Sequence, residues 1–179
     1  MDSEELEDFQ IPQEVLDQLS DPLLLQKYVD EGKTFQEILG YSDDMMGRFY
    51  QIARGLLDMK KLKEASDAFL FLTTLNPHVP TYWLGLGMCE HLHEEYQRSL
   101  VAYGMAIVSD REDPLPHYYS AACHFAMRNY ETAKVALEIA IRICADREEC
   151  LQVKEMSERS LAGVENRLRE RWDNMSLGD

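Results

Sequence analysis

The sequence is short of basic residues: 18 Lys and Arg stand against 33 Asp and Glu among 179 residues, which gives a formal net charge of −15. Because phosphate contacts require clustered Lys and Arg side chains, this shortage argues against a nucleic-acid binder. The acid is also unevenly placed. Residues 1–44 contain thirteen acidic and two basic residues, a net charge of −11, and residues 45–179 carry the remaining −4. An acidic leader therefore precedes a nearly balanced body, whose hydrophobic residues suffice for the core of one domain.

Signals for export and membrane insertion are also missing. The first five residues, Met-Asp-Ser-Glu-Glu, include neither the basic nor the apolar segment of a secretory signal, so we expect the mature protein to start where the sequence starts. The longest stretch without a formal charge, residues 68–89, is interrupted by Asn76-Pro77-His78-Val79-Pro80. Because proline breaks helices, this stretch predicts two helices around a turn rather than a membrane span. The four cysteines, at positions 89, 123, 144 and 150, form no CxxC pair, which favours reduced thiols.

Motifs of the common enzyme classes do not occur: the P-loop, GxSxG and HExxH patterns are all missing. Gly85-Leu86-Gly87 supplies the first two glycines of a dinucleotide-binding loop, but position 90 is glutamate and the preceding residues are predicted to be helical. His91 and His93 would diverge by about 200° on a helix, so they cannot share one metal ion there. We therefore expect a protein that is not an enzyme and that uses no metal or cofactor.

What the sequence does contain is an internal repeat of 34 residues. Segments 46–79, 80–113 and 114–147 carry similar residue types at equivalent positions. These equivalent sets are Phe49, Trp83 and His117; Ile52, Leu86 and Ser120; Ala53, Gly87 and Ala121; Leu62, Tyr96 and Tyr130; Ala65, Ser99 and Ala133; Phe69, Tyr103 and Leu137; and Leu72, Ala106 and Ala140. An ordinary helical bundle needs a period of 3.6 but no self-similarity over 34 residues, so it is the less favoured interpretation.

This pattern is typical of the tetratricopeptide (TPR) repeat. In each unit a small residue on the first helix, such as Ala53, faces a small residue on the second, such as Ala65, so that the two helices can approach closely. We therefore predict an all-α fold, a right-handed superhelix of three TPR helix pairs over residues 45–147. An N-terminal helical extension at 11–44 and a capping helix at 148–172 flank the repeats, and the tails 1–10 and 173–179 are predicted to be disordered.

The flanking segments carry their own helix signals. Asp21-Pro22 places a capping residue before a proline of the first turn, and Ser42 precedes Asp43 and Asp44 as the cap of the first repeat helix. Short helices are expected at 11–19, 22–29 and 34–39. The capping helix is predicted from apolar residues at helical steps among Glu and Arg, namely Leu151, Met156, Leu161, Val164 and Leu168.

The first helix of each TPR pair lines a concave groove, so its inner positions predict a binding site. The predicted groove residues are Tyr50, Arg54, Leu57, Leu84, Met88, His91, Tyr118, Ala122 and Phe125. Aromatic, Leu and Met side chains suit apolar residues of an extended or helical peptide. Clamps for a terminal carboxylate would instead place Lys, Arg and Asn there, and only Arg54 fits that pattern. Singly, each of these side chains could belong to the core, but together they predict a binding surface.

Residues from about 33 to 145 resemble the class II chaperones of type III secretion systems. The resemblance rests on Gly32-Lys33-Thr34, Tyr50-Gln51-Ile52-Ala53, Leu84-Gly85-Leu86-Gly87, Asp113-Pro114 and Ala121-Ala122-Cys123. It implies a bacterial cytoplasmic chaperone that holds an extended N-terminal segment of a hydrophobic translocator in its groove and keeps that partner soluble, unassociated and competent for secretion. It also implies a homodimer contact through the N-terminal helices. Direct nucleic-acid binding and stable membrane insertion are not expected.

Two other functions remain open from the sequence. One is a TPR scaffold that joins folded partners and has no role in secretion. The other is a chaperone with an added regulatory role in transcription, exercised through a further partner. Co-expression separates the scaffold from the chaperone, because only a chaperone should make an insoluble hydrophobic partner soluble.

Overall fold

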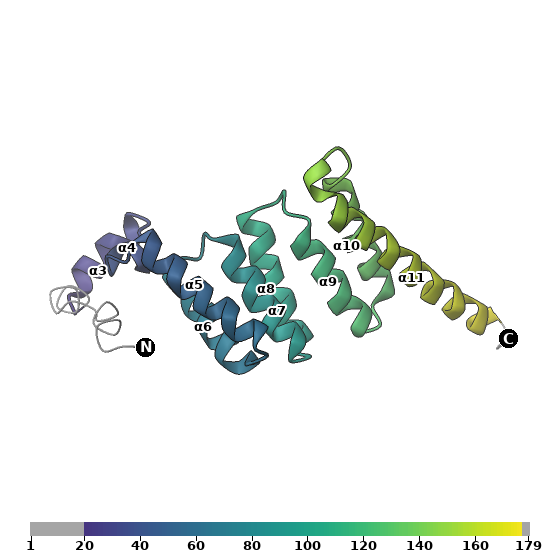
Figure 1. Ribbon diagram of the computed structural model, residues 1–179, viewed down its shortest axis with the longest axis horizontal. Helices are drawn as coiled ribbons and strands as arrows, with labels where there is room; N and C mark the ends of the chain where they lie inside the picture. Colours follow the sequence, from purple (N-terminus) through teal and green to yellow (C-terminus); the bar gives the residue numbers. More distant parts are fainter. Residues whose placement is uncertain (1–19, 177–179) are drawn as a thin grey trace.

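The computed structural model describes residues 20–176, and the predicted helix at 11–19 lies outside them. The described part is all-α, as predicted, and runs as an elongated row of helices (Figure 1). Its elements are α3 (Pro22–Asp30), α4 (Phe35–Ile38), α5 (Asp43–Asp58), α6 (Leu62–Leu75), α7 (Pro80–Leu92), α8 (Tyr96–Ser109), α9 (Leu115–Ala126), α10 (Tyr130–Ile143), the 3₁₀ turn η1 (Glu148–Cys150) and α11 (Leu151–Ser176).

Three helix pairs, α5/α6, α7/α8 and α9/α10, repeat the same backbone turn. Lys60, Glu94 and Arg128 have φ angles of 60°, 63° and 62°, and they stand 34 residues apart. In each turn this residue donates its N–H to the carbonyl three residues earlier, over 2.9 Å in all three cases. A left-handed conformation at a residue other than glycine is uncommon, so its recurrence at one spacing marks a true structural repeat. The predicted TPR fold is confirmed.

Close helix contacts explain the small residues of the repeat. Ala53 and Ala65 are fully buried, and the buried Ser99 hydroxyl donates a 2.8 Å hydrogen bond to the carbonyl of Gly87. A Cβ atom on Gly87 would overlap the ring of Tyr103. Gly87 therefore lets α7 lie directly against the largest buried side chain of α8.

The N-terminal extension packs on the first helix pair through α4. Thr34 and Glu37 form a capping box at the start of α4, and Gln36 in its first turn is 7% exposed. The Gln36 amide donates to the carboxylate of Asp43 over 2.8 Å and accepts from the Asn76 amide over 2.8 Å. This network ties the extension to the start of α5 and the end of α6.

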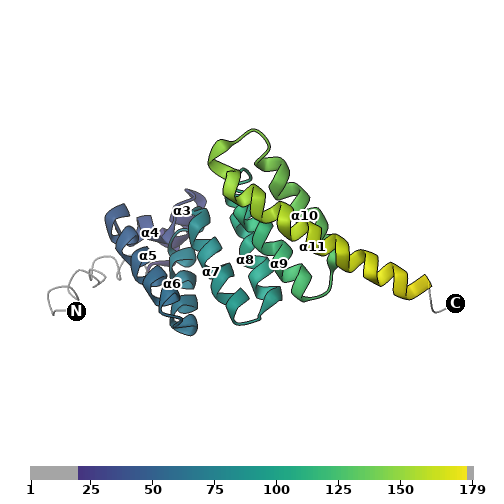
Figure 2. The ribbon, with the colours of Figure 1, turned by 45° about the vertical axis from the view of Figure 1, so that its right-hand side comes forward.

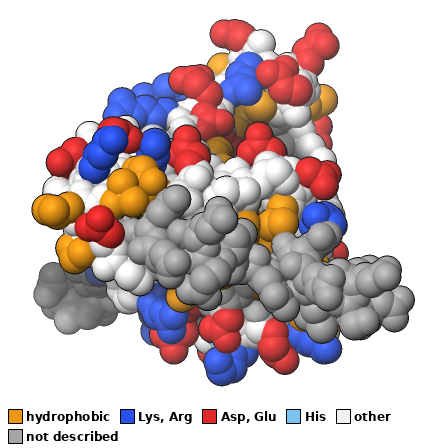
Figure 3. Space-filling view, turned by 90° about the vertical axis from the view of Figure 1, so that its left-hand side faces the viewer, with side chains coloured by type: hydrophobic (Ala, Val, Ile, Leu, Met, Phe, Trp, Pro, Cys, Tyr) orange, Lys and Arg blue, Asp and Glu red, His pale blue; other side chains and the backbone are white. Residues whose placement is uncertain are grey.

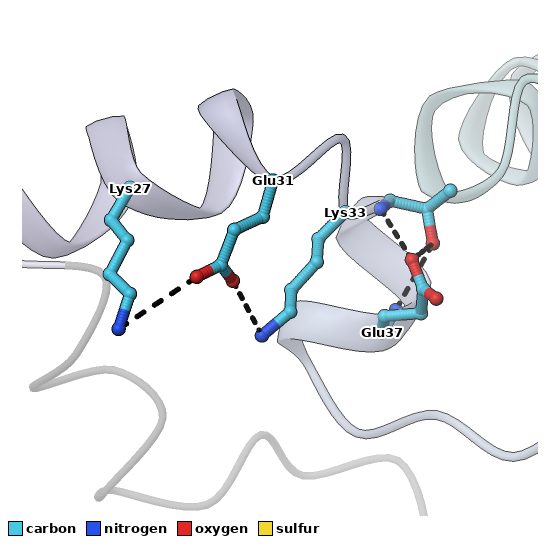
Figure 4. A network of polar contacts seen from close by, with 5 residues as sticks. Lys27, Glu31, Lys33 and Glu37 are labelled. Carbon is cyan, nitrogen blue, oxygen red and sulfur yellow. Dashed lines mark hydrogen bonds and ion pairs between the residues drawn. The ribbon is translucent and has the colours of Figure 1, made fainter.

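An exposed chain of ion pairs links α3 to the turn that precedes α4 (Figure 4). Glu31 lies 3.8 Å from the ammonium of Lys27 and 3.1 Å from that of Lys33. Exposed ion pairs of this kind contribute roughly 0–1 kcal/mol each. These ion pairs stay within the extension, and it is the amide network of Gln36 that connects the extension to the repeats.

The capping helix is longer than the sequence predicts. α11 runs to Ser176, four residues past the expected end, so the tail predicted to be disordered from residue 173 is helical up to that point. Val164, which is 2% exposed, packs with Leu161 and Leu168 against the third pair. The far end of α11 projects beyond the repeats (Figures 1 and 2), where Trp172 is 69% exposed.

Within residues 20–176, no helix combines the length and the apolar character that crossing a bilayer requires.

Candidate peptide-binding surface

The first helices of the three pairs contact one another in succession and form one surface. α5 contacts α7, α7 contacts α9, and α9 contacts α11. α11 thus occupies the place of a further first helix, beside α9 (Figure 2). All nine predicted groove residues lie on α5, α7 or α9. The predicted site is therefore spread along one series of neighbouring helices.

In the first pair, the predicted residues are partly used for packing. Tyr50 and Leu57 are half-buried against the core, whereas Arg54 is exposed. The Tyr50 ring lies 5.8 Å from that of Tyr82 on α7 and 6.1 Å from that of Phe69 on α6. The aromatic contact positions Tyr50 at the joint between the first two pairs, with part of its surface left free.

In the second pair, Leu84 and Met88 are half-buried, and His91 turns toward the third pair. The Nδ1 atom of His91 lies 3.2 Å from the Sγ atom of Cys123, and its ring meets that of Tyr96 edge to face at 5.6 Å. His91 therefore joins α7 to α9, and much of its surface is taken up by that contact. Among the described residues, no group of three or more His, Cys, Asp or Glu is placed to hold a metal ion.

The His91 and Cys123 pair has the spacing of a nucleophile and its base, but not the electrostatics. Burial raises the pKa of the Cys123 thiol and lowers the pKa of the His91 imidazole. A reactive thiolate requires the opposite shifts. The pair is therefore a neutral contact between repeats, in line with the buried Cys89, whose pKa burial raises to about 12.

In the third pair, Tyr118, Ala122 and Phe125 are brought together at one hollow. They line a cavity of about 290 Å³ with Ala121 on the same helix and Leu137 on α10, and Ser160, Gly163 and Val164 of α11 close it. Phe125 is 38% exposed, and its ring is tilted over that of Tyr130 at 5.3 Å. The three predicted residues therefore form one physical site.

The α11 wall of this cavity is the part that sequence reasoning missed, because residues 148–172 were assigned only a capping role. A usable signal is the small residue pair Ser160 and Gly163, because Ser160 precedes Gly163 by three residues and the apolar Val164 by four, so all three share one helix face. Small side chains on a capping helix leave room at its contact with the repeats. The capping helix thus contributes to the surface as well as closing the stack.

The middle of this surface carries almost no formal charge. α9 contains no Asp, Glu, Lys or Arg, and α7 contains only Glu90. Glu90 is 4% exposed, accepts a 2.6 Å hydrogen bond from Ser66 and pairs with Arg98 at 3.2 Å. Two neighbouring helices of a strongly acidic protein therefore present an uncharged face. Such a face suits an apolar ligand, because a charged one would lose hydration without gaining a partner.

Comparisons with known proteins agree with this fold. No family model matches the chain. Chaperone protein SicA of Salmonella typhimurium is 28% identical over 111 residues, which cover 62% of this chain and 67% of SicA. Low calcium response locus protein H of Yersinia pestis is 24% identical over 147 residues, covering 82% of this chain and 86% of that protein. The solved structure of the Yersinia enterocolitica type III secretion translocator chaperone SycD has a TM-score of 0.71 at 21% identity, covering 73% of this chain and 98% of SycD.

The predicted resemblance to type III secretion translocator chaperones is confirmed. SicA supports it at the level of sequence, and SycD supports the fold.

Proposed function

We propose that this protein is a cytoplasmic chaperone of a bacterial type III secretion system. It binds an apolar, extended N-terminal segment of a hydrophobic translocator across α5, α7 and α9. The observation that carries this proposal is the uncharged face of α7 and α9 in a chain with a net charge of −15. An apolar segment gains burial there, and the acidic remainder keeps the complex in solution.

Solved complexes of similar proteins support this choice of partner. SycD has been solved with a peptide of the translocator YopD, and PcrH with the chaperone binding regions of PopD and PopB. The mechanism is shielding: the surface covers apolar side chains of the translocator that would otherwise associate with one another. The protein needs no catalytic residue or cofactor for this role.

Co-expression tests the proposal directly. A hydrophobic translocator from the same bacterium should be recovered in the soluble fraction when the chain is present and in the pellet when it is absent. The matched control is the Leu84→Glu variant, which changes the proposed surface. A translocator that is equally soluble with the parent, with the variant and without either would contradict the chaperone role and favour a scaffold.

The extension offers a surface for a homodimer. Leu23 on α3 is 82% exposed and Phe35 on α4 is 48% exposed. In the view onto the N-terminal end, hydrophobic side chains gather beside the residues that are not described (Figure 3). We propose that these helices contact a second copy.

Sedimentation of the full-length protein tests the dimer. Leu23→Glu should convert a dimer to a monomer, whereas Leu151→Glu, at an exposed leucine on α11, should not. Point variants are preferable to removal of residues 1–41, because that truncation would also remove the Gln36 network. A parent protein that sediments as a monomer would refute the dimer and leave the peptide-binding surface intact.

A further inference from the structure

The cavity between α9, α10 and α11 has a shape and lining of its own. Its floor is made of core residues, since Ala121, Leu137 and Val164 are each 1–2% exposed. Tyr118 and Phe125, one helical turn to either side of Ala122, flank its entrance on α9. Ser160 and Gly163 form the facing wall on α11. The cavity is therefore a hollow set into the core, bounded by two helices and open to the surface between them.

Small residues on both helices account for the space. α9 contributes Ala121 and Ala122, and α11 contributes Ser160 and Gly163. A Cβ atom built on Gly163 would meet no neighbouring heavy atom within 4 Å. Gly163 is therefore not required by close packing, unlike Gly87, and its missing side chain keeps the cavity open.

The lining restricts the occupant to an uncharged, apolar group. None of its eight residues is ionised, and Ser160 is the only one with a side-chain hydroxyl besides Tyr118. A carboxylate or ammonium group entering this hollow would lose its hydration without a compensating charge. An apolar cavity of about 150 Å³ can hold a benzene molecule, so about 290 Å³ is ample for one Leu, Met or Phe side chain.

We propose that this cavity is an anchor pocket for one bulky apolar side chain of the bound translocator segment, and that Gly163 sets the size of that side chain. The proposal rests on the proposed function for the identity of the partner. The segment lies across α9 and inserts the side chain between Tyr118 and Phe125 toward Val164. The capping helix thereby becomes a specificity element.

A probe that mimics the side chain tests the pocket without a translocator. N-acetyl-leucinamide is titrated into the full-length protein, and methyl chemical shifts are followed by NMR. Val164 and Leu137 should shift in a saturable manner, while the methyls of Val101 and Val108 on α8 should not. N-acetyl-aspartate should leave all four unchanged. The absence of a shift at Val164 would overturn the proposal. Probe binding that weakens as the protein concentration rises would also overturn it, because a second copy of this protein would then be occupying the cavity.

Two variants of α11 form a matched pair for this test. Gly163→Leu fills the hollow that Gly163 lines and should abolish the shifts, whereas Ala162→Leu adds the same bulk at the neighbouring position, which is also exposed but does not line the cavity, and should preserve them. Gly163→Leu raises the helix propensity of α11 and Ala162→Leu lowers it only slightly, so loss of binding would not come from loss of fold. Equal binding of the probe to both variants would refute the assignment of Gly163.

Binding of the translocator segment then separates this proposal from the proposed function. Gly163→Leu should weaken the affinity for the segment by about tenfold or more, because the segment would no longer bury one leucine side chain in the cavity. Ala162→Leu should leave the affinity unchanged. If Leu84→Glu weakens binding and Gly163→Leu does not, the pocket is wrong and the chaperone function stands. If the parent protein binds no translocator segment, the proposed function fails, and the NMR titration decides the pocket alone.

Discussion

The Ser66 hydroxyl on α6 donates a hydrogen bond of 2.6 Å to the carboxylate of Glu90 on α7, which joins the first helix pair to the second. The same carboxylate lies 3.2 Å from the guanidinium of Arg98 on α8. One nearly buried charge thus connects three helices. A buried carboxylate is tolerated only when its partners offset its lost hydration, so both contacts bear on stability.

Arg98→Glu should destabilise the protein by about 1–2 kcal/mol, because it places a second carboxylate beside Glu90. This loss of stability is smaller than that expected for a fully buried ion pair, because the Arg98 side chain is 67% exposed. Urea unfolding measures the effect. The matched control is Lys63→Glu, which breaks a pair to Asp67 in which both side chains are at least 66% exposed. Equal losses in the two variants would show that the burial of Glu90 is unimportant.

Gly87→Leu should destabilise the fold by about 1–3 kcal/mol or more, because its side chain would overlap the ring of Tyr103. Gly104→Ala is the control. A Cβ atom there meets nothing within 4 Å, and alanine should stabilise α8 by about 0.5–1 kcal/mol. Thermal unfolding checks both values. An unchanged midpoint for Gly87→Leu would count against the close contact that defines the repeat.

The repeat made the three helix pairs predictable, because Ala53, Gly87 and Ala121 mark the same helix contact at one spacing. Ser42 was likewise predictable as a cap, and its hydroxyl accepts a 3.2 Å hydrogen bond from the Met45 N–H. Contacts between side chains far apart in sequence were not. Nothing in the local pattern around His91 indicates that it meets Cys123, 32 residues later.

The wall of the cavity escaped prediction for a related reason. The periodic apolar residues of α11 show that one face is buried, but they do not show how deeply that face packs. Ser160 and Gly163 lie where α11 passes α9. The distance between these two helices is fixed only by the way each of them packs against α10. Groove positions on α9 could be read from the repeat, whereas the facing wall belongs to no repeat.

Stability should fall as the pH falls below about 6.5, because burial lowers the pKa of His91, His117 and His124. In the unfolded chain these imidazoles have pKa values near 6.5, so below that pH the unfolded state binds more protons than the folded state. The free energy of unfolding therefore decreases on acidification.

Urea unfolding at pH 7.5 and 5.5 measures this loss. His91→Asn should reduce the loss, whereas His93→Asn, at an exposed position, should not. Should His91→Asn lose as much stability as the parent between these pH values, burial of the imidazole would not explain the acid sensitivity.

Leu84→Glu should remove binding of an apolar translocator segment while leaving the helix pairs intact. Leu84 is half-buried on α7, in the uncharged middle of the surface, so the new carboxylate would be covered by the bound segment without a partner. Burying an unpaired charge at such a contact typically costs at least about 2 kcal/mol, which is more than tenfold in affinity. Val101→Glu is the control, because Val101 is 67% exposed on α8 and lies on a second helix of a pair. Circular dichroism reports the fold, and fluorescence anisotropy of a labelled N-terminal translocator segment reports binding. If folded Leu84→Glu binds as tightly as Val101→Glu, the segment lies elsewhere, and if Leu84→Glu unfolds, Leu84 belongs to the core.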